Sequence, residues 1–344
     1  MTTQNLNPNP QFTRRLLQQK LPDLGAFTLL DVGCSGGVHD LFRQFGGRLK
    51  AVGFDPLTPE IERLRQTEPN PNIRYEDAFV GSPRYAELFP DAARSSAPNN
   101  DFTTRTSSLR AQKGNTEAYQ KEHFNAGQEL KFSERRIALD DYCRDHKIEK
   151  VDFLKIDTDG HDYNVLISAE NLLSNGVLGA SVEAVFHGPA HPHANVFANI
   201  DRFMREKGFT LCDLDMFRYA RGALPLPFYY DIPAQTRGGA PLWGEAVYFR
   251  DLADPDYEKK WGLKFGLRDK VVLACLYDLF GLPDCAAELV QNCPEAFDPE
   301  ARAEYLNLLV PPMVTGKLVY DEYVGVFDMH PELWYPKSKL FGRG

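Results

Sequence analysis

Long apolar runs are missing from this chain of 344 residues, and none approaches the roughly 20 residues that a membrane-spanning helix requires. The six cysteines are scattered and form no Cys-x-x-Cys pair, which argues against a zinc site and against a disulfide framework. Basic residues are outnumbered, with 39 Lys and Arg against 48 Asp and Glu, and the net charge is −9. These features argue against nucleic acid and against a membrane surface as the partner.

The remaining composition is that of an ordinary globular protein. Hydrophobic residues make up 43% of the chain and charged residues 25%, which is enough apolar material for a large core. Residues 1–10 are rich in Asn and Pro and lack the apolar centre of a signal peptide. Together with the scattered cysteines, which we interpret as reduced thiols, this predicts a cytoplasmic protein.

Strand-like apolar stretches alternate with helix-like segments between residues 27 and 207. This alternation predicts an α/β domain with a mostly parallel sheet and helices on both faces. The last two strands have no helix between them, so we expect them to be antiparallel neighbours. The seven predicted strands cover residues 27–32, 49–54, 73–80, 151–157, 180–186, 209–214 and 246–249.

The length predicts a core domain with an extension. We assign residues 1–26 to an N-terminal segment, 27–252 to the α/β domain and 253–344 to a helical C-terminal extension. Two long polar stretches interrupt the domain at 81–133 and 215–244. If the sixth strand is parallel to the first five, residues 215–244 leave the carboxyl edge of the sheet and are a candidate lid loop.

A lysine lies inside the apolar strand at 151–157. An unpaired buried charge is costly, so Lys155 requires a partner. Asp157 is two residues further on and therefore lies on the same face of the strand. Glu183, within the fifth strand, is a candidate second partner with a structural role.

A glycine turn follows the first strand, in the sequence Asp31-Val32-Gly33-Cys34-Ser35-Gly36-Gly37. It does not fit the dinucleotide pattern G-x-G-x-x-G, and the Asp31 carboxylate would repel a pyrophosphate. It suits a ligand with a cationic amino group, whereas Asp55, which ends the second strand, suits ribose hydroxyls. A cationic amino acid joined to adenosine describes S-adenosylmethionine. The residues expected to hold it are Asp31, Gly33, Ser35, Gly36, Asp55, Asp77 and Ala78.

At this point the chain resembles a known family. Residues 153–160, Phe-Leu-Lys-Ile-Asp-Thr-Asp-Gly, are similar to the Lys-Ile-Asp-x-Glu-Gly signature of FkbM-type methyltransferases. Residues 139–142, Leu-Asp-Asp-Tyr, and the segment 106–109, Thr-Ser-Ser-Leu, also resemble family segments. The resemblance covers residues 27–252. The chain departs from the pattern at Asp159, where glutamate is usual, and His161 and Asp162 follow.

The resemblance implies a Rossmann-like class I methyltransferase fold that uses S-adenosylmethionine. It implies O-methylation of a hydroxyl group on a sugar, a glycan or a related metabolite. Ser107, Ser108, Arg110 and Asp159 are then the candidate contacts to this acceptor.

Methyl transfer to a hydroxyl requires that its proton be removed, by a base or with the help of a metal. His187, at the end of the fifth strand, is the first candidate base, and His161 and Asp157 are the others. Asp157, Asp159 and Asp162 could bind Mg²⁺ as a second cofactor through their carboxylate oxygens. The alternative is that Asp157 serves Lys155 and that Asp159 serves the loop backbone.

Two alternatives remain at the level of the sequence. The first is an NAD-linked oxidoreductase or epimerase, which would use Asp55 and would not need Asp31. The second is a non-catalytic binding module that retains the fold and uses its helical extension as a partner surface. A homo-oligomer is compatible with either reading and with the methyltransferase.

Overall fold

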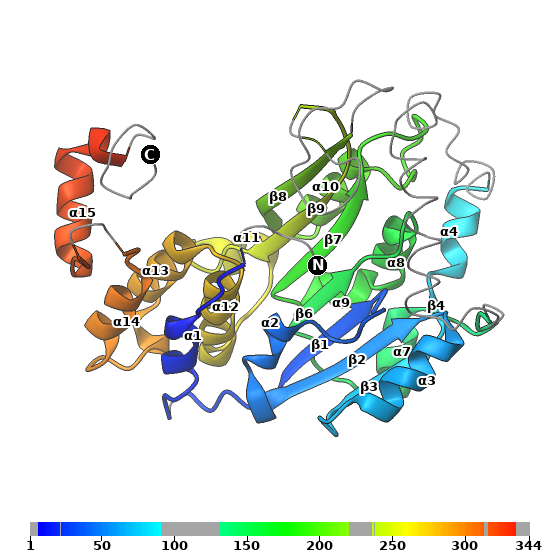
Figure 1. The fold of residues 1–344 in the computed structure, drawn as a ribbon, viewed down its shortest axis with the longest axis horizontal. Helices are drawn as coiled ribbons and strands as arrows, with labels where there is room; N and C mark the ends of the chain where they lie inside the picture. Colours follow the sequence, from blue (N-terminus) through cyan, green and yellow to red (C-terminus); the bar gives the residue numbers. More distant parts are fainter. Residues whose placement is uncertain are drawn as a thin grey trace. The chain divides into compact units, whose positions relative to one another are not determined.

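The computed structural model describes residues 6–20, 22–90, 131–219, 236, 238–312 and 316–334. Seven of the described strands form one sheet with the order β3-β2-β1-β6-β7-β9-β8 (Figure 1). The pairs β1–β6, β2–β3 and β6–β7 are parallel, whereas β9 is antiparallel to both β7 and β8. The predicted mostly parallel sheet and its antiparallel last pair are therefore confirmed. The strands are β1 (Phe27–Val32), β2 (Leu49–Asp55), β3 (Ile73–Asp77), β6 (Phe153–Ile156), β7 (Gly179–Val185), β8 (Phe209–Tyr219) and β9 (Ala240–Arg250).

Helices cover the sheet where the chain crosses between parallel strands (Figure 1). These are α3 (Thr58–Thr67), α4 (Pro83–Leu88), α7 (Leu139–Asp145), α8 (Asp162–Ser168), α9 (Glu170–Asn175) and α10 (Phe197–Glu206). The predicted third strand divides into β3 and the short β4 (Phe79–Val80), which pairs with β5 (Arg136–Ile137).

Side chains along each strand point alternately to the two faces of the sheet, and both faces carry buried apolar residues. In β6, Leu154 and Ile156 belong to the hydrophobic core, which includes side chains from α4, α7, α8, α9 and α10. Lys155, between them, therefore lies on the opposite face. Asp31 of β1 and Glu183 of β7 lie on that face too, because their neighbours in sequence belong to the same core.

Arg250, the last residue of β9, connects this strand to the chain segments around the ends of α9 and α10. Its side chain is fully buried and lies over the ring of Phe209, 4.2 Å from the ring centroid. The guanidinium donates to the carbonyl oxygens of Leu173, Val177 and Lys207 at 2.5, 2.6 and 3.1 Å. Leu173 lies in the last turn of α9 and Lys207 directly follows α10, so the guanidinium supplies donors to carbonyls that the end of a helix leaves without a helical partner.

The predicted lid loop is shorter than the sequence suggested. Residues 215–219 continue β8 and residues 240–244 begin β9, where Phe217 and Trp243 stack with ring centroids 3.9 Å apart. This aromatic pair extends the strand pairing into a segment that its Pro and Gly content had marked as loop. β8 is parallel to β7, since both are antiparallel to β9, so the chain leaves β8 at the carboxyl edge as expected. Residues 220–235 lie outside the described part of the chain.

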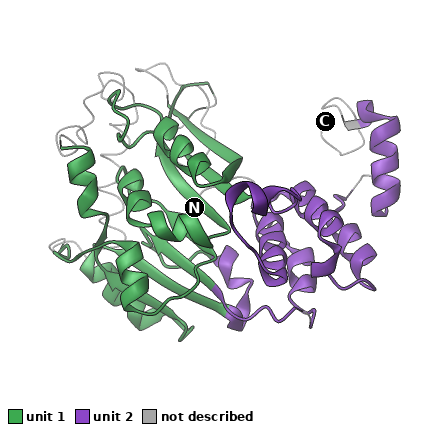
Figure 2. Cartoon of the chain, turned by 180° about the vertical axis from the view of Figure 1, so that it is seen from behind, with its two compact units in different colours: residues 1–4, 28–39, 49–250 green, residues 5–27, 40–48, 251–344 purple. Residues whose placement is uncertain are grey.

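The chain divides into two compact units (Figure 2). The first consists of residues 1–4, 28–39 and 49–250, and the second of residues 5–27, 40–48 and 251–344. Most of residues 1–26, which we predicted to be a separate N-terminal segment, thus belong to the same unit as the C-terminal helices. The helices of the second unit are α1 (Gln11–Leu16), α2 (Asp40–Arg43), α11 (Tyr257–Trp261), α12 (Leu267–Leu279), α13 (Pro283–Asn292), α14 (Arg302–Leu309) and α15 (Tyr320–Met329).

Asp278 connects α12 to the N-terminal segment within the second unit. Its Oδ2 accepts hydrogen bonds from the backbone N–H and the hydroxyl of Thr13, at 2.9 and 2.7 Å, and its Oδ1 accepts from Asn7 at 2.7 Å. Among the helices that the structure describes, none is long and apolar enough to cross a membrane.

Candidate functional site

The glycine turn after β1 lies directly against the end of β6. Gly33 has a positive φ of 77°, and a Cβ at this position would collide with the carbonyl oxygen of Asp157. Only glycine permits both the conformation and the close approach. Gly36, with φ 85°, has no described atom within 4 Å of where its Cβ would be. The turn is therefore tightly packed at Gly33 and open at Gly36.

Lys155 connects this turn to the end of β6. Its Nζ donates to the carbonyl oxygen of Gly33 at 2.8 Å and lies 3.3 Å from Asp31 Oδ1 and 3.4 Å from Asp157 Oδ2. Burial alone would lower the pKa of the ammonium, but Asp31 and Asp157 raise it above its ordinary value. Lys155 therefore remains charged although only 7% of it is exposed.

The predicted pairing of Lys155 with Asp157 is confirmed, but its second carboxylate partner is Asp31 and not Glu183. Asp31 is directly opposite Lys155 in the parallel pairing of β1 with β6. Asp31 is 1% exposed, and burial raises its pKa against the attraction of Lys155. We expected Asp31 to face the amino group of a ligand. In the structure it faces a cation that belongs to the protein.

Asp55 ends β2 beside the glycine turn. Its carboxylate accepts a hydrogen bond from the Leu57 N–H at 2.8 Å, and burial raises its pKa. Asp77 is opposite Asp55 in the β2–β3 pairing, and its carboxylate lies 3.3 Å from Nη2 of Arg65. Ala78 follows and donates its N–H to the Asp55 carbonyl at 3.2 Å. The structure thus brings together the predicted residues of the second and third strands.

Glu60, on α3, is a member of this site that the sequence reasoning missed. Its Oε1 accepts the Gly36 N–H at 2.9 Å, and its two oxygens accept from Arg63 at 2.6 and 2.7 Å. Glu60 is 6% exposed, so a buried carboxylate supports the open end of the glycine turn. A glutamate in the first turn of a helix carries no signal of such a contact in the sequence.

The segment after β6 forms a tight turn around Asp162. This buried carboxylate accepts from the Thr158 N–H and hydroxyl, each at 2.9 Å, and from the Gly160 N–H at 3.2 Å. The carboxylate of Asp162, which the sequence offered as a magnesium ligand, thus holds the backbone of the turn. Within the described residues, no group of three or more His, Cys, Asp or Glu is arranged to hold a metal ion.

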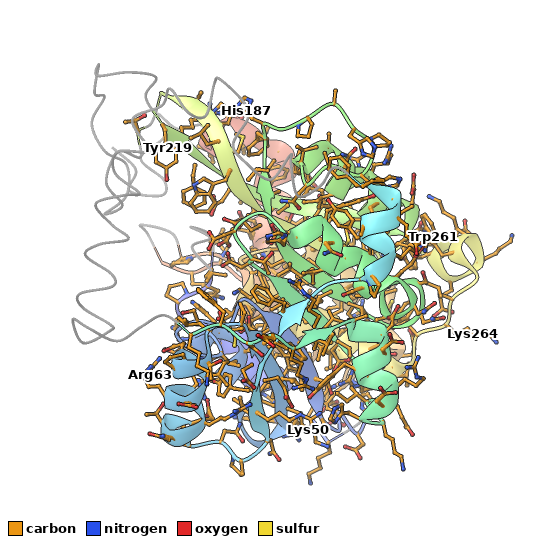
Figure 3. All side chains as sticks on the ribbon, turned by 90° about the vertical axis from the view of Figure 1, so that its right-hand side faces the viewer. Lys50, Arg63, His187, Tyr219, Trp261 and Lys264 are labelled. Carbon is orange, nitrogen blue, oxygen red and sulfur yellow. The ribbon has the colours of Figure 1, made fainter. Side chains whose placement is uncertain are left out.

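The candidate bases lie at the carboxyl edge. Nε2 of His187 is 2.9 Å from the carbonyl oxygen of Pro241, and Figure 3 shows His187 and Tyr219 at the same end of the unit, opposite Lys50. His161 is exposed at the N-terminal cap of α8, where its side chain makes no capping bond. Asp157 is partly exposed beside Lys155. Ser107, Ser108 and Arg110 lie outside the described residues.

A row of acidic residues crosses the neighbouring strands. Glu183 of β7 is opposite Glu245 of β9, which is in turn opposite Asp215 of β8. Glu183 also accepts the N–H of Asp159 at 3.0 Å. Burial first, and then Asp162, Asp157 and Asp159, raise the pKa of Glu183 well above its ordinary value. No local sequence pattern marks this row, because it depends on the order of the strands in the sheet.

A comparison of the sequence with models of known protein families identifies the family of this chain. Residues 36–211, just over half of the chain, match the family described as "Methyltransferase FkbM domain". The chain belongs to this family. The match begins at Gly36 and ends in β8, so it includes Asp55, Lys155 and Glu183, whereas Asp31 and Gly33 precede it.

The similarity of this chain to solved structures is weaker. A protein of Listeria monocytogenes described as an S-adenosylmethionine-dependent methyltransferase is 12% identical over 70% of this chain and 98% of its own, with a TM-score of 0.32. A TehB-like methyltransferase of Corynebacterium glutamicum is 15% identical over 70% and 87%, with a TM-score of 0.27. Both scores are too low to bear on the function of this chain. No curated protein matches the chain significantly.

Proposed function

We propose that this FkbM-family protein is an S-adenosylmethionine-dependent O-methyltransferase that methylates a hydroxyl group of a sugar, a glycan or a related metabolite. One observation carries the proposal beyond family membership. The glycine turn, the Asp55 carboxylate and the turn after β6 meet at the carboxyl edge of a parallel sheet, which is where such sheets bind their ligands.

The residues at this edge fit the donor in chemical terms. The Asp55 carboxylate suits the ribose hydroxyls, and Asp77 and Ala78 flank the position proposed for the adenine. Space beside Gly36 suits the amino-acid end. In this proposal Asp31 acts indirectly, since its contact is with Lys155, which holds the Gly33 carbonyl.

When bound, the donor supplies a methyl group on a sulfonium, and the chain must orient the hydroxyl and accept its proton. His187 remains our first candidate base. A carbonyl oxygen only accepts hydrogen bonds, so the contact with Pro241 implies that Nε2 carries the hydrogen and that Nδ1 is the proton acceptor. His161 and Asp157 are the other candidates, and Asp159, Ser107, Ser108 and Arg110 are proposed to contact the acceptor.

Calorimetry with S-adenosylmethionine tests the donor site. We expect micromolar binding by the wild type, binding at least about tenfold weaker in Asp55→Ala, and unchanged binding in Lys50→Met, whose exposed side chain lies at the other end of β2. NAD⁺ is titrated in parallel. Binding of NAD⁺ in place of S-adenosylmethionine would indicate the oxidoreductase alternative, and binding of neither would indicate a non-catalytic module.

A transfer assay tests the acceptor class. Radioactive methyl groups from S-adenosylmethionine are followed into a panel of methyl glycosides and nucleotide sugars, with small phenols as the contrasting class. We expect transfer to at least one saccharide and a fall in rate of at least about a hundredfold in His187→Ala, with donor binding unchanged. Transfer to phenols alone would contradict the saccharide part of the proposal.

A further inference from the structure

Four backbone amides of the turn between β6 and α8 donate hydrogen bonds that hold the turn. The Asp157 N–H donates to the Val32 carbonyl at 3.0 Å, and the N–H groups of Thr158 and Gly160 donate to Asp162. The fourth of these amides, of Asp159, donates to Oε2 of Glu183 at 3.0 Å. Three of these contacts come from β1 or from α8 at the end of the turn itself. The fourth comes from β7.

The contact from Glu183 holds Asp159, the residue of the turn with the least favourable backbone conformation. Asp159 has a φ of 52°, in the left-handed region, which is unfavourable for most residues with a Cβ. Gly160 follows with φ 110°, which glycine adopts readily, so Asp159 is the residue whose conformation needs support. A backbone of this kind persists only where surrounding contacts determine it. Glu183 supplies such a contact from a neighbouring strand.

The turn is connected to the glycine turn by contacts of 3.4 Å or less. Two residues before Asp159, the Asp157 carboxylate lies 3.4 Å from Lys155 Nζ, which donates to the Gly33 carbonyl at 2.8 Å. Because a Cβ at Gly33 would meet the carbonyl of Asp157, the two turns are also in close backbone contact. A shift of the Asp157 backbone therefore displaces the glycine turn.

We propose that Glu183 is a positioning residue for the donor site: by accepting the Asp159 N–H, it holds the turn after β6 in the conformation that supports the glycine turn. The proposal rests on the donor-binding function proposed above. Glu183 acts here through the backbone and through Lys155, without touching the donor.

The hydrogen bond does not require a charged carboxylate. Burial and the nearby Asp162, Asp157 and Asp159 favour the neutral form of Glu183. A neutral carboxyl retains a carbonyl oxygen that accepts an N–H, and the side chain of glutamine offers the same oxygen at the same length. Aspartate retains the charge but is one methylene shorter, so its oxygens cannot reach Asp159 without movement of the backbone.

Glu183→Gln and Glu183→Asp therefore have opposite expected outcomes. We expect Glu183→Gln to bind S-adenosylmethionine within about threefold of the wild type and Glu183→Asp to bind at least about tenfold more weakly, the effect of about one lost hydrogen bond. Ser181→Ala is the matched control, since Ser181 is buried on the same face of β7 two residues earlier.

Hydrogen exchange of a peptide that covers residues 157–163 provides a second readout. We expect it to be faster in Glu183→Asp and unchanged in Glu183→Gln and Ser181→Ala. Donor binding that survives in Glu183→Asp, or that is lost in Glu183→Gln, would overturn the proposal. If the wild type does not bind S-adenosylmethionine, the proposed function fails, and the exchange data still decide whether Glu183 holds the turn.

Discussion

Replacement of Lys155 by methionine tests the ion-pair cluster most directly. The substitution keeps the length of the side chain and removes the cation that neutralises Asp31, whose side chain is 2% exposed. Loss of one partner of a buried ion pair costs about 3–5 kcal/mol. We expect a loss of about 4 kcal/mol at neutral pH, mostly from Asp31, because water can solvate the more exposed Asp157 carboxylate.

A second substitution separates this cause from a packing defect. Asp31→Asn in the Lys155→Met background removes the buried charge, so we expect the double variant to recover about 2 kcal/mol. The Lys155→Met defect should also shrink as the pH falls, because protonation of Asp31 removes the same charge. In the double variant that pH dependence should be much smaller, since the buried Asp31 carboxyl is no longer present.

Urea unfolding followed by circular dichroism measures the overall loss. Hydrogen exchange of peptides from β1 and β6 assigns it to the first unit, because a chain of two units need not unfold in one step. Lys50→Met, exposed on β2, is the control and should change stability by less than about 0.5 kcal/mol. A Lys155→Met loss below about 1 kcal/mol, or a double variant no more stable than the single one, would refute the reasoning.

Three further predictions concern other buried polar groups. Arg250→Lys should lower the free energy of unfolding by at least about 2 kcal/mol, because an ammonium cannot reach all three carbonyls that the guanidinium holds. Urea unfolding measures this loss, and an unchanged stability would contradict the role of Arg250 in holding these carbonyls. The folded-state pKa of Glu183 lies above its unfolded value, so the wild type loses stability as the pH rises from about 4.3 through the raised value. The difference in melting temperature between Glu183→Gln and the wild type should therefore move in favour of Glu183→Gln as the pH rises above about 4.3, and a constant difference would count against the raised pKa. Asp278→Ala should free the N-terminal segment at a cost of about 2 kcal/mol, seen as faster hydrogen exchange in residues 6–16, whereas exchange at the wild-type rate would show that other contacts hold that segment.

Much of the fold followed from local patterns. The strand predicted at residues 27–32 is β1 with the same bounds, and the predicted alternation of strands and helices gives the parallel part of the sheet. The ends of β8 and β9 were misjudged as loop. Pro241 and Gly244 are poor strand residues on their own, but Pro241 lies beside a register shift, where a missing N–H is tolerated, and Gly244 lies against the backbone of Asp215.

The residues of the candidate site were also predictable only in part. Gly33, Asp55, Lys155 and Asp157 were recognisable because a turn glycine, a carboxylate at a strand end and a charge in an apolar strand are unusual within a few residues of chain. Glu60 was not recognisable, because its contact with Gly36 depends on how α3 packs against the glycine turn. Side chains that meet only after packing leave no local pattern to detect.

The sequence by itself determined which residues alternate between the two faces of each strand, where the glycine turn forms, and that Lys155 pairs with Asp157. Each of these depends on residues close together in the chain, for which backbone sterics and the two-residue period of a strand are sufficient. Only the tertiary structure decided that Asp31 neutralises Lys155 and that Glu183 holds the Asp159 amide. These contacts require β1 and β7 to flank β6, and the order of strands is set by the packing of the whole sheet.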